Sequence, residues 1–262
     1  MGPDLGQAQH RVDHLSPAGW QARYLQQAAW TRPLRDFLFP QIQINPQARI
    51  LDVGCGPATL TGEISQRTGA GVFGLDRDPA AISLAKKTDP RAAFLAGDGL
   101  RLPFPRGVFD LTGCHFFLMW VRDPLAALAE MARVTRPGGL VMALAEPDYG
   151  GRIDYPPALE ELGRLQSEAL AAQGADPRLG RKLAGLFQGA GLRRVRTGIL
   201  GGQWENHPAN GGRDLEWEVI ESDLAGRVPP EVVQDLRAAE AAAREGGERV
   251  LFVPTFYAWG IV

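Results

Sequence analysis

The stretch ILDVGCGP, residues 50–57, decides the fold of this chain. Residues 50–53 are mostly apolar and predict a short buried strand, which Gly54-Cys55-Gly56 ends. Glycines let the backbone turn sharply and approach a ligand closely. We therefore expect a strand that leads through a tight turn into a helix over residues 58–67.

The same alternation of strand and helix continues along the chain. Further strands are predicted over residues 72–75, 92–96, 110–117 and 140–145, the last after a tight turn at 136–139. Helices are predicted over residues 16–38 (kinked at Pro33), 79–87 and 124–134. Short strands alternating with helices of this length indicate βαβ units and a mostly parallel sheet.

After Glu146 the pattern changes without a recognisable linker. Helices are predicted over 157–173, 177–189 and 230–244, strands over 192–200 and 250–262, and residues 201–226 are mixed and rich in tryptophan. We expect one domain made of an N-terminal helical cap (1–45), a ligand-binding core (46–146), a lid-like insertion for the substrate (147–248, including the strand at 192–200) and a final strand (249–262).

Composition excludes several classes of protein. The 262 residues include 28 basic and 30 acidic side chains, so the net charge of −2 makes non-specific binding to nucleic acid or membrane surfaces a poor expectation. Two cysteines cannot build a disulfide framework, and no apolar run approaches the roughly 20 residues that span a bilayer. The first 13 residues lack the apolar segment of a signal peptide. We expect a cytoplasmic protein, and the sequence leaves its oligomeric state open.

Polar residues stand where the predicted strands end. In a parallel α/β sheet, ligands bind beyond the carboxyl ends of the strands. After the glycine turn, these positions hold Asp76, Asp98, Cys114-His115, Glu146 and Asp148. Asp76 follows Gly54 by 22 residues, near the roughly 20 expected for a carboxylate that binds a ribose diol. The spacing predicts a ligand that contains a nucleoside.

Two features indicate which nucleoside this is. Thr59 stands where a dinucleotide fingerprint has its third glycine, which argues against NAD. Asp52, two residues before the turn, would repel a pyrophosphate but favour a cation. Asp52 and Asp98 together suit S-adenosylmethionine, which has an ammonium, a sulfonium, a ribose diol and an adenine amine.

Residues 50–146 resemble the core of the class I S-adenosylmethionine-dependent methyltransferases. Five stretches carry the resemblance in the expected order: ILDVGCGP at 50–57, GLD at 74–76, GD at 97–98, FDL at 109–111 and RVTRPGG at 133–139. One departure is Ala58, which replaces a frequent third glycine of the first motif. The resemblance implies a Rossmann-like sheet of seven mostly parallel strands, with a C-terminal antiparallel hairpin formed by residues 192–200 and 250–262.

The resemblance also implies roles for individual residues. Gly54, Cys55 and Gly56 would line the methionine end of the cofactor, Asp52 would reach its ammonium, and Asp76 would bind the ribose. The remaining contacts would come from Arg77 beside the adenine, Asp98 at its amine, Gly99 and Leu100 alongside, and Cys114 and His115 at the sulfonium. Tyr24, on the first helix, is a further candidate for the methionine carboxylate, with packing as its alternative role.

The acceptor site is less defined by sequence. His115 is the candidate general base, with a packing role as its alternative. Trp120, Glu146, Asp148 and Tyr149 are candidate substrate contacts, and Trp204 and Trp217 are candidates for an aromatic pocket or for the core. His10 and His14 have helical spacing but no third ligand, so no metal site is expected.

We therefore expect methyl transfer to a small-molecule acceptor, with S-adenosylhomocysteine as product. Enzymes that methylate nucleic-acid amines have an Asn/Asp-Pro-Pro-aromatic turn where this chain has Gly113-Cys114-His115-Phe116. Two alternatives stay open at this point. One is an NAD(P)-binding oxidoreductase, and the other is a protein that binds S-adenosylmethionine without transferring its methyl group.

Overall fold

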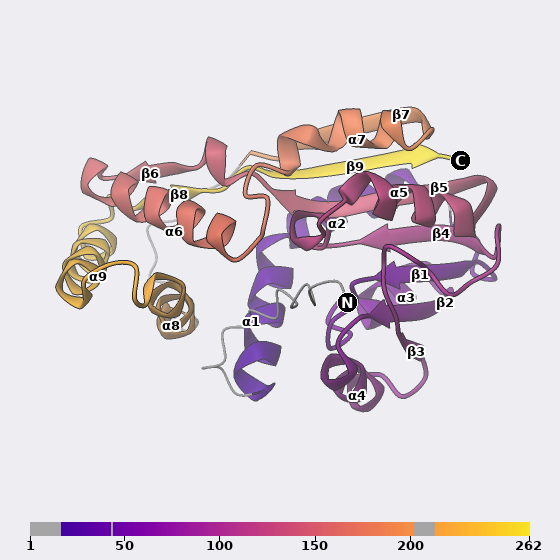
Figure 1. Ribbon diagram of the computed structural model, residues 1–262, viewed down its shortest axis with the longest axis horizontal. Coiled ribbons are helices and arrows are strands. Elements are labelled where there is room, and N and C mark those ends of the chain that lie inside the picture. The colour runs from indigo at the N-terminus through magenta and orange to yellow at the C-terminus, as the bar shows by residue number, and fades with distance from the viewer. Residues whose placement is uncertain (1–16, 43, 202–212) are drawn as a thin grey trace, which may run out of the picture.

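A seven-stranded sheet in the order β3-β2-β1-β4-β5-β9-β7 forms the centre of the molecule (Figure 1). The computed structural model describes residues 17–42, 44–201 and 213–262. The strands of this sheet are β1 (Arg49–Val53), β2 (Gly71–Asp76), β3 (Ala93–Ala96), β4 (Phe109–Cys114), β5 (Thr135–Pro147), β7 (Arg193–Ile199) and β9 (Thr255–Ile261). β1 to β5 pair in parallel, and β9 is antiparallel to both β5 and β7. The predicted fold class is confirmed.

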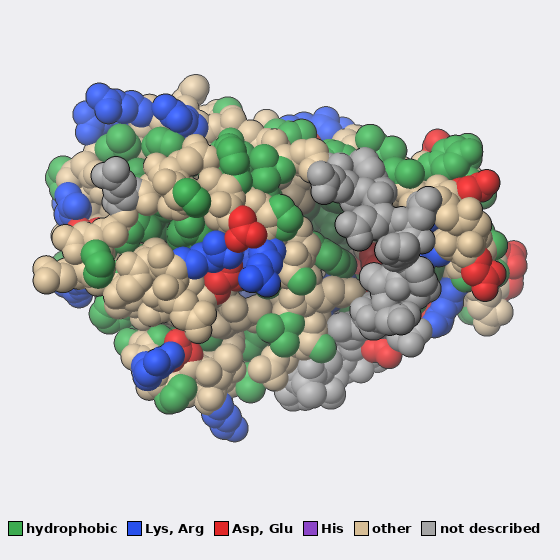
Figure 2. Space-filling model, turned by 180° about the vertical axis from the view of Figure 1, so that it is seen from behind, with side chains coloured by type: hydrophobic (Ala, Val, Ile, Leu, Met, Phe, Trp, Pro, Cys, Tyr) green, Lys and Arg blue, Asp and Glu red, His purple; other side chains and the backbone are tan. Residues whose placement is uncertain are grey.

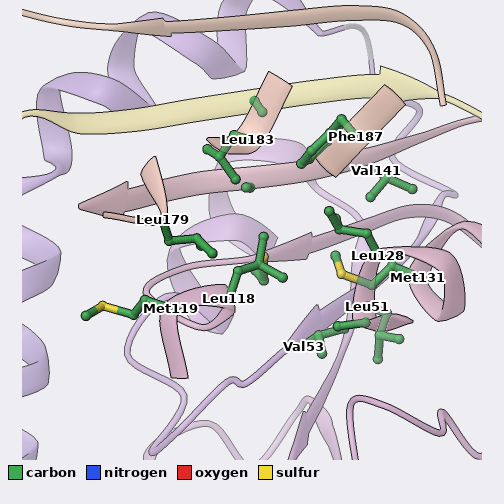
Figure 3. Packing of buried hydrophobic residues seen from close by; sticks show 14 of the residues in the cluster. Leu51, Val53, Leu118, Met119, Leu128, Met131, Val141, Leu179, Leu183 and Phe187 are labelled. Carbon is green, nitrogen blue, oxygen red and sulfur yellow. The ribbon is translucent and has the colours of Figure 1, made fainter. Parts of the chain in front are cut away.

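Alternate residues of the central strands face two separate apolar clusters. Leu51, Val53 and Val141 point into a cluster with α5 (Pro124–Val134) and α7 (Leu183–Gly189), as Figure 3 shows. Ile50 and Met142 point into a second cluster, on the other face of the sheet, with α2 (Arg32–Leu38) and α3 (Thr61–Thr68). Because both faces are covered, the central strands are apolar almost throughout, as the sequence predicted.

Aspartate-proline pairs begin two of the surrounding helices. The side chains of Asp78 and Asp123 accept hydrogen bonds from the amides of Ala80 and Ala126, at the start of α4 (Pro79–Thr88) and of α5. In each helix a proline occupies the first turn, where its missing N–H costs nothing. These caps fix where the helices begin, and with them the loops that follow β2 and β4.

The predicted single strand at 250–262 is wrong. Residues Val250–Phe252 form β8, which leaves the main sheet and pairs with β6 (Ile153–Tyr155). Pro254 lies in the gap before β9 and has no N–H for a sheet ladder. The predicted hairpin is therefore made by β7 and by residues 255–261 alone.

The tight turn predicted at 136–139 lies inside β5, which begins at Thr135. Thr135 pairs with Phe109 of β4, and a register shift follows. The amide of Gly138 donates to the carbonyl of Val262 over 3.0 Å, and the amide of Val262 donates to Gly139 over 3.1 Å. Residues 136–139 stand opposite the single residue Asp110 of β4, and Gly138 has a φ of 77°, so the segment bulges out of the ladder. The strand predicted at 110–117 ends at Cys114, where a loop leads to the short helix η2 (Leu118–Trp120).

The predicted lid is a group of elements beside one end of the sheet. It contains β6, β8, α6 (Glu160–Ala172), α8 (Arg213–Leu224) and α9 (Pro230–Glu245). Leu162, Trp217, Ile220 and Leu236 belong to its own apolar cluster. Figure 1 shows α1 (Pro17–Trp30) between this group and the strands. The lid therefore has its own core, while both its ends join the main sheet.

Buried ion pairs join the parts of the lid. Arg152 and Arg249 both bond Asp154, and Arg249 also bonds Glu240. The indole Nε1 of Trp217 donates to Glu240 over 2.6 Å. Each buried charge of this network has a partner, as burial requires.

The face shown in Figure 2 carries no single kind of charge. On the face shown in Figure 2, basic side chains lie in several separate places among acidic and apolar ones. Across the described ranges, none of the helices combines the length and apolar character that a membrane crossing needs.

Candidate functional site

The loop after β1 is held by backbone hydrogen bonds to β2. The amides of Gly54 and Cys55 both donate to the carbonyl of Leu75, over 2.7 and 3.1 Å. Gly54 and Gly56 have φ values of 74° and 51°, which favour glycine. Ala58 has φ 66°, a left-handed conformation that costs an alanine roughly 1–2 kcal/mol. The departure from a third glycine thus leaves local strain in this loop.

Asp76 stands at the end of β2, beside that loop. Its Oδ2 accepts from the amide of Gly56 over 2.9 Å, and its Oδ1 accepts from the amide of Asp78 over 2.9 Å. A carboxylate has about four acceptor sites, so these two bonds orient the group and leave capacity for a ligand. Arg77, which follows it, is exposed.

Asp52 is a buried carboxylate under the same loop. It is 4% exposed, and its Oδ2 accepts a hydrogen bond from the hydroxyl of Thr61 over 2.8 Å. Burial raises the pKa of Asp52 to about 6, against the Thr61 bond, and the charge of Asp76 adds to the increase. A cation bound near Asp52 would relieve this cost.

The loop after β3 approaches the β1 loop through Phe117. Asp98 is exposed, and its Oδ1 accepts from the amide of Leu100 over 2.9 Å. A Cβ atom on Gly99 would lie 2.6 Å from Cζ of Phe117, and one on Gly54 would lie 2.6 Å from Cδ2 of the same ring. The phenylalanine therefore fills the space that both glycines leave, and sequence reasoning missed it.

We predict that Gly99→Ala destabilises the protein by about 1–3 kcal/mol, because the new methyl group overlaps the Phe117 ring. Thermal unfolding measures this loss. The double variant Gly99→Ala/Phe117→Leu should recover most of it, since leucine lacks the overlapping ring atom. Gly71→Ala is the control, because nothing lies within 4 Å of its Cβ position. Equal stability of the Gly71 and Gly99 variants would contradict the packing described.

The two cysteines near the site are buried and unreactive. Cys55 is 7% exposed and Cys114 fully buried. Burial raises the pKa of both thiols, and the nearby charges of Asp52 and Asp76 (for Cys55) or Glu146 and Asp52 (for Cys114) raise it further. Neither thiol is a nucleophile at neutral pH.

His115 is tied to the N-terminal helices. Its Nε2 lies 2.8 Å from the hydroxyl of Thr31, which also accepts from Arg35 over 2.7 Å. Arg35 in turn donates to both carboxylate oxygens of Glu63, over 2.9 and 2.8 Å. Burial lowers the pKa of His115 to about 3, and the charge of Arg35 lowers it further. The ring is therefore neutral at physiological pH.

Glu146 holds the loop that carries His115. It is fully buried, and its carboxylate accepts from the amides of Phe117, Leu118 and Met119 over 2.9, 2.9 and 3.2 Å. Burial raises its pKa to about 7 against these three bonds. The carboxylate thus positions the β4 loop, and its contact with a substrate stays a prediction.

Tyr24 of α1 lies over the glycine loop. Atoms of its ring are 3.9 to 4.0 Å from the Cβ position of Gly56. The structure thus brings Tyr24 beside the glycine loop, and its contact with a cofactor stays a prediction.

The other predicted acceptor contacts lie after β5 and in η2. Asp148 is 2% exposed, accepts from the amide of Gly150 and forms an ion pair with Arg181. Tyr149, in η3 (Tyr149–Gly151), is half-buried, and Trp120 is 43% exposed. Trp217 belongs to the lid core. Trp204, His10 and His14 lie outside the described residues. In the described part of the chain no group of three metal-ligating side chains occurs.

Comparison with known proteins gives a consistent result. Residues 51–143 match the family described as "Methyltransferase domain". An uncharacterised methyltransferase of Schizosaccharomyces pombe is 35% identical over 170 residues, covering 60% of this chain and 61% of that protein. A demethylmenaquinone methyltransferase of Lysinibacillus sphaericus is 30% identical over 185 residues, covering 62% of this chain and 76% of that protein.

A solved structure extends the similarity across the fold. A putative methyltransferase of Haloferax volcanii, in complex with the Trm112 methyltransferase activator, matches with a TM-score of 0.60. The two are 18% identical, and the match covers 93% of this chain and 94% of the other. Several curated relatives are matched over only about half of their length, such as 51% of the demethylmenaquinone methyltransferase of Renibacterium salmoninarum.

Proposed function

Because this chain belongs to the class I S-adenosylmethionine-dependent methyltransferase family, we propose that it transfers a methyl group from S-adenosylmethionine to a small-molecule acceptor. The observation that carries the proposal is the glycine loop after β1, set between the buried Asp52 and the oriented Asp76. This arrangement suits an adenosyl cation and would repel a diphosphate.

The residues present fit the cofactor. Gly56 has no side chain beneath the Tyr24 ring, whose atoms lie 3.9 to 4.0 Å from its Cβ position, so a ligand can approach the loop backbone closely. Asp52 has one hydrogen bond and is otherwise desolvated, so an ammonium group would stabilise it. We propose that Asp52, Gly54, Cys55 and Gly56 hold the methionine end, and that Asp76 holds the ribose.

The adenine contacts follow from the loops after β2 and β3. We assign Arg77, Asp98, Gly99 and Leu100 to the adenine, and Cys114 and His115 to the sulfonium side. Asp98 is already bonded to the amide of Leu100 through Oδ1, and its second oxygen is the acceptor we propose for the adenine amine.

When bound, S-adenosylmethionine supplies a methyl group attached to a positively charged sulfur. The acceptor's lone pair would form the new bond to the methyl carbon, and the sulfur would keep the electron pair of the broken bond. The protein's part is to hold the acceptor in line and to exclude water, which contributes up to about 7–11 kcal/mol to such reactions. Tyr24 lies over the glycine loop, and the Glu146 carboxylate fixes the β4 loop that we propose borders the site.

The role of His115 as a general base stays a prediction. Its neutral ring is bonded to Thr31 through Nε2, so a proton would have to be taken up at Nδ1 or after that bond breaks. A group with a pKa of about 3 is a weak base at neutral pH. We therefore propose that His115 chiefly borders the methyl group. Trp120 and Tyr149 are the candidates we propose for substrate contact.

The pH dependence of cofactor binding tests the Asp52 assignment. The ammonium group binds the ionised carboxylate, so affinity for S-adenosylhomocysteine should fall by about tenfold per pH unit below about pH 6. The stability of the ligand-free protein depends on the ionisation of Asp52 in the opposite direction. The folded pKa lies above the unfolded value of about 3.9, so this group's contribution to stability is lost as pH rises through about 6.

Calorimetry at pH 5, 6 and 7 measures the first effect. Asp52→Asn should abolish the dependence and lower the affinity at pH 7. A profile that is the same in both proteins would refute the contact between Asp52 and the ammonium group.

Labelled S-adenosylmethionine incubated with a panel of metabolites tests the function itself. Mass spectrometry should detect a methylated small molecule together with S-adenosylhomocysteine. Label in tRNA or protein alone would exclude a small acceptor. Binding without any turnover would support a cofactor-binding protein, and tight binding of NADH would support an oxidoreductase.

A further inference from the structure

A series of hydrogen bonds joins the loop after β4 to the N-terminal helices. It runs from His115 to Thr31, which lies between α1 and α2, then to Arg35 of α2 and to Glu63 of α3. Thr31 is 3% and Arg35 2% exposed, so both side chains depend on protein partners for their hydrogen bonds. The donor and the acceptor of each bond can therefore be assigned from the partners present.

Arg35 is held in one orientation. Its Nε and Nη2 donate to the two carboxylate oxygens of Glu63 over 2.9 and 2.8 Å, and Nη2 also donates to the carbonyl of Ala28 over 2.8 Å. The remaining nitrogen, Nη1, donates to the hydroxyl oxygen of Thr31 over 2.7 Å. A guanidinium group has only donors, so Thr31 is the acceptor of this bond.

The hydroxyl proton of Thr31 is left for another acceptor. Nε2 of His115 lies 2.8 Å from the hydroxyl oxygen, and the carbonyls of Gln27 and Ala28 lie 3.2 and 3.3 Å from it. A hydroxyl group donates to oxygen over about 2.5–3.0 Å, and both carbonyls lie beyond this range. The Ala28 carbonyl also accepts already from Arg35. The distances therefore favour a bond from the Thr31 hydroxyl to Nε2.

This bond decides where the ring of His115 carries its proton. In a neutral imidazole one nitrogen is a donor and the other an acceptor, and the bond at one nitrogen fixes the state of the other. Burial lowers the pKa of His115, and the charge of Arg35 lowers it further, so the ring is neutral. Since Nε2 accepts from Thr31, the single proton is on Nδ1.

His115 stands beside the glycine loop. Cys114 ends β4 and pairs in parallel with Val53, which ends β1. The residues that follow them, His115 and Gly54, therefore begin two adjacent loops at the same edge of the sheet. These are the loops that we propose border the methionine end and the sulfonium of the cofactor.

We propose that Thr31 is a positioning residue, which holds the neutral ring of His115 with its proton on Nδ1, and that Arg35 orients Thr31 for this role. The inference rests on the proposed function and deepens it. Nδ1 already carries a proton and the lone pair of Nε2 is taken by Thr31, so neither nitrogen can accept a proton from the methyl acceptor. The ring therefore offers the reaction a hydrogen-bond donor and not a base.

NMR of the 15N-labelled full chain measures the tautomer directly. The chain contains four histidines, so the spectrum of ring nitrogens is simple, and His115→Gln identifies the signals of His115 by their loss. Protonated and unprotonated ring nitrogens differ strongly in 15N chemical shift. At pH 7 we expect the shift of a protonated nitrogen for Nδ1 and that of an unprotonated nitrogen for Nε2.

Variants at Thr31 separate the hydroxyl bond from packing. Thr31→Val keeps the shape of the side chain without its hydroxyl, so the proton should move at least in part to Nε2. Thr31→Ser keeps a hydroxyl and should retain the wild-type tautomer. Thr88→Val is the matched control, because the hydroxyl of this exposed threonine bonds a helix carbonyl, that of Leu84, over 3.1 Å. It should leave the His115 signals unchanged, and if Thr31→Val does not fold, the tautomer of the wild type still decides.

Two results would overturn the inference. One is a wild-type His115 ring with its proton on Nε2, and the other is the same tautomer in Thr31→Val as in the wild type. The spectra are then repeated after saturation with S-adenosylhomocysteine, which calorimetry measures. Changed His115 signals would support its place beside the cofactor. Failure of the ligand to bind, or binding that leaves these signals unchanged, would count against the proposed function and not against the tautomer, so the two failures are distinguishable.

Discussion

Replacing Asp76 with alanine is expected to weaken S-adenosylhomocysteine binding by about 100-fold, measured by calorimetry. A hydrogen bond to a charged group is worth about 1.5–3 kcal/mol, and each 1.4 kcal/mol is tenfold in affinity. Two bonds to a ribose diol therefore account for the loss. The substitution also removes the acceptor that orients the amides of Gly56 and Asp78.

Asp123→Ala is the matched control for this variant. Asp123 also accepts a hydrogen bond from a backbone amide, that of Ala126, but it stands at the start of α5. Its loss should cost about 1 kcal/mol of stability and leave cofactor affinity unchanged. If the Asp76 variant binds within threefold of the wild type, the ribose assignment fails.

Replacing Arg35 with methionine is expected to lower the free energy of unfolding by about 3–5 kcal/mol. Its side chain is 2% exposed and bonds Thr31, the carbonyl of Ala28 and both oxygens of Glu63. Removal leaves the half-buried Glu63 with Arg67, 2.7 Å away, as its remaining partner. Chemical denaturation measures the loss, and Arg32→Met, an exposed arginine of the same helix, should change stability little.

A double variant separates the ion pair from the packing. In Arg35→Met/Glu63→Gln the carboxylate that had lost Arg35 is neutral and Arg67 keeps Asp36 as partner, so part of the stability should return. The single and double variants would be equally unstable if the guanidinium acted only through the Thr31 and Ala28 contacts. In both variants His115 loses the positive charge that helps lower its pKa, so its pKa should rise.

Local signals in the sequence predicted where the glycine loop, Asp52 and Asp76 lie. The glycine turn, Asp52 and Asp76 lie within about 25 residues of one another. Their positions follow from where the first two strands end and where the chain turns. The confirmed seven-stranded sheet then had to bring Asp76 to the amide of Gly56, because β1 and β2 are neighbours.

Contacts between distant segments could not be predicted in this way. Thr31 and His115 are 84 residues apart, and no spacing rule joins them. β6 has three residues and gains its structure from pairing with β8, nearly a hundred positions later. The segment at 136–139 bulges within β5, as its turn residues indicate, but its bonds to Val262 could not be predicted from local sequence.

Helix α8 was missed for a different reason. Trp217, Ile220 and Leu224 recur at three- and four-residue spacing, which is a helical signal, but the surrounding stretch contains many glycine and polar residues.

The position of β9 between β5 and β7 has a consequence for how the protein is made. During synthesis, residues 135–147 and 193–199 leave the ribosome long before residues 255–261, which must pair with both. Until then the nascent sheet has an open edge at β5, and β7 has no strand to pair with in the native order. During this interval a chaperone that binds the nascent chain would protect the open edge. Without a chaperone, the edge would favour aggregation.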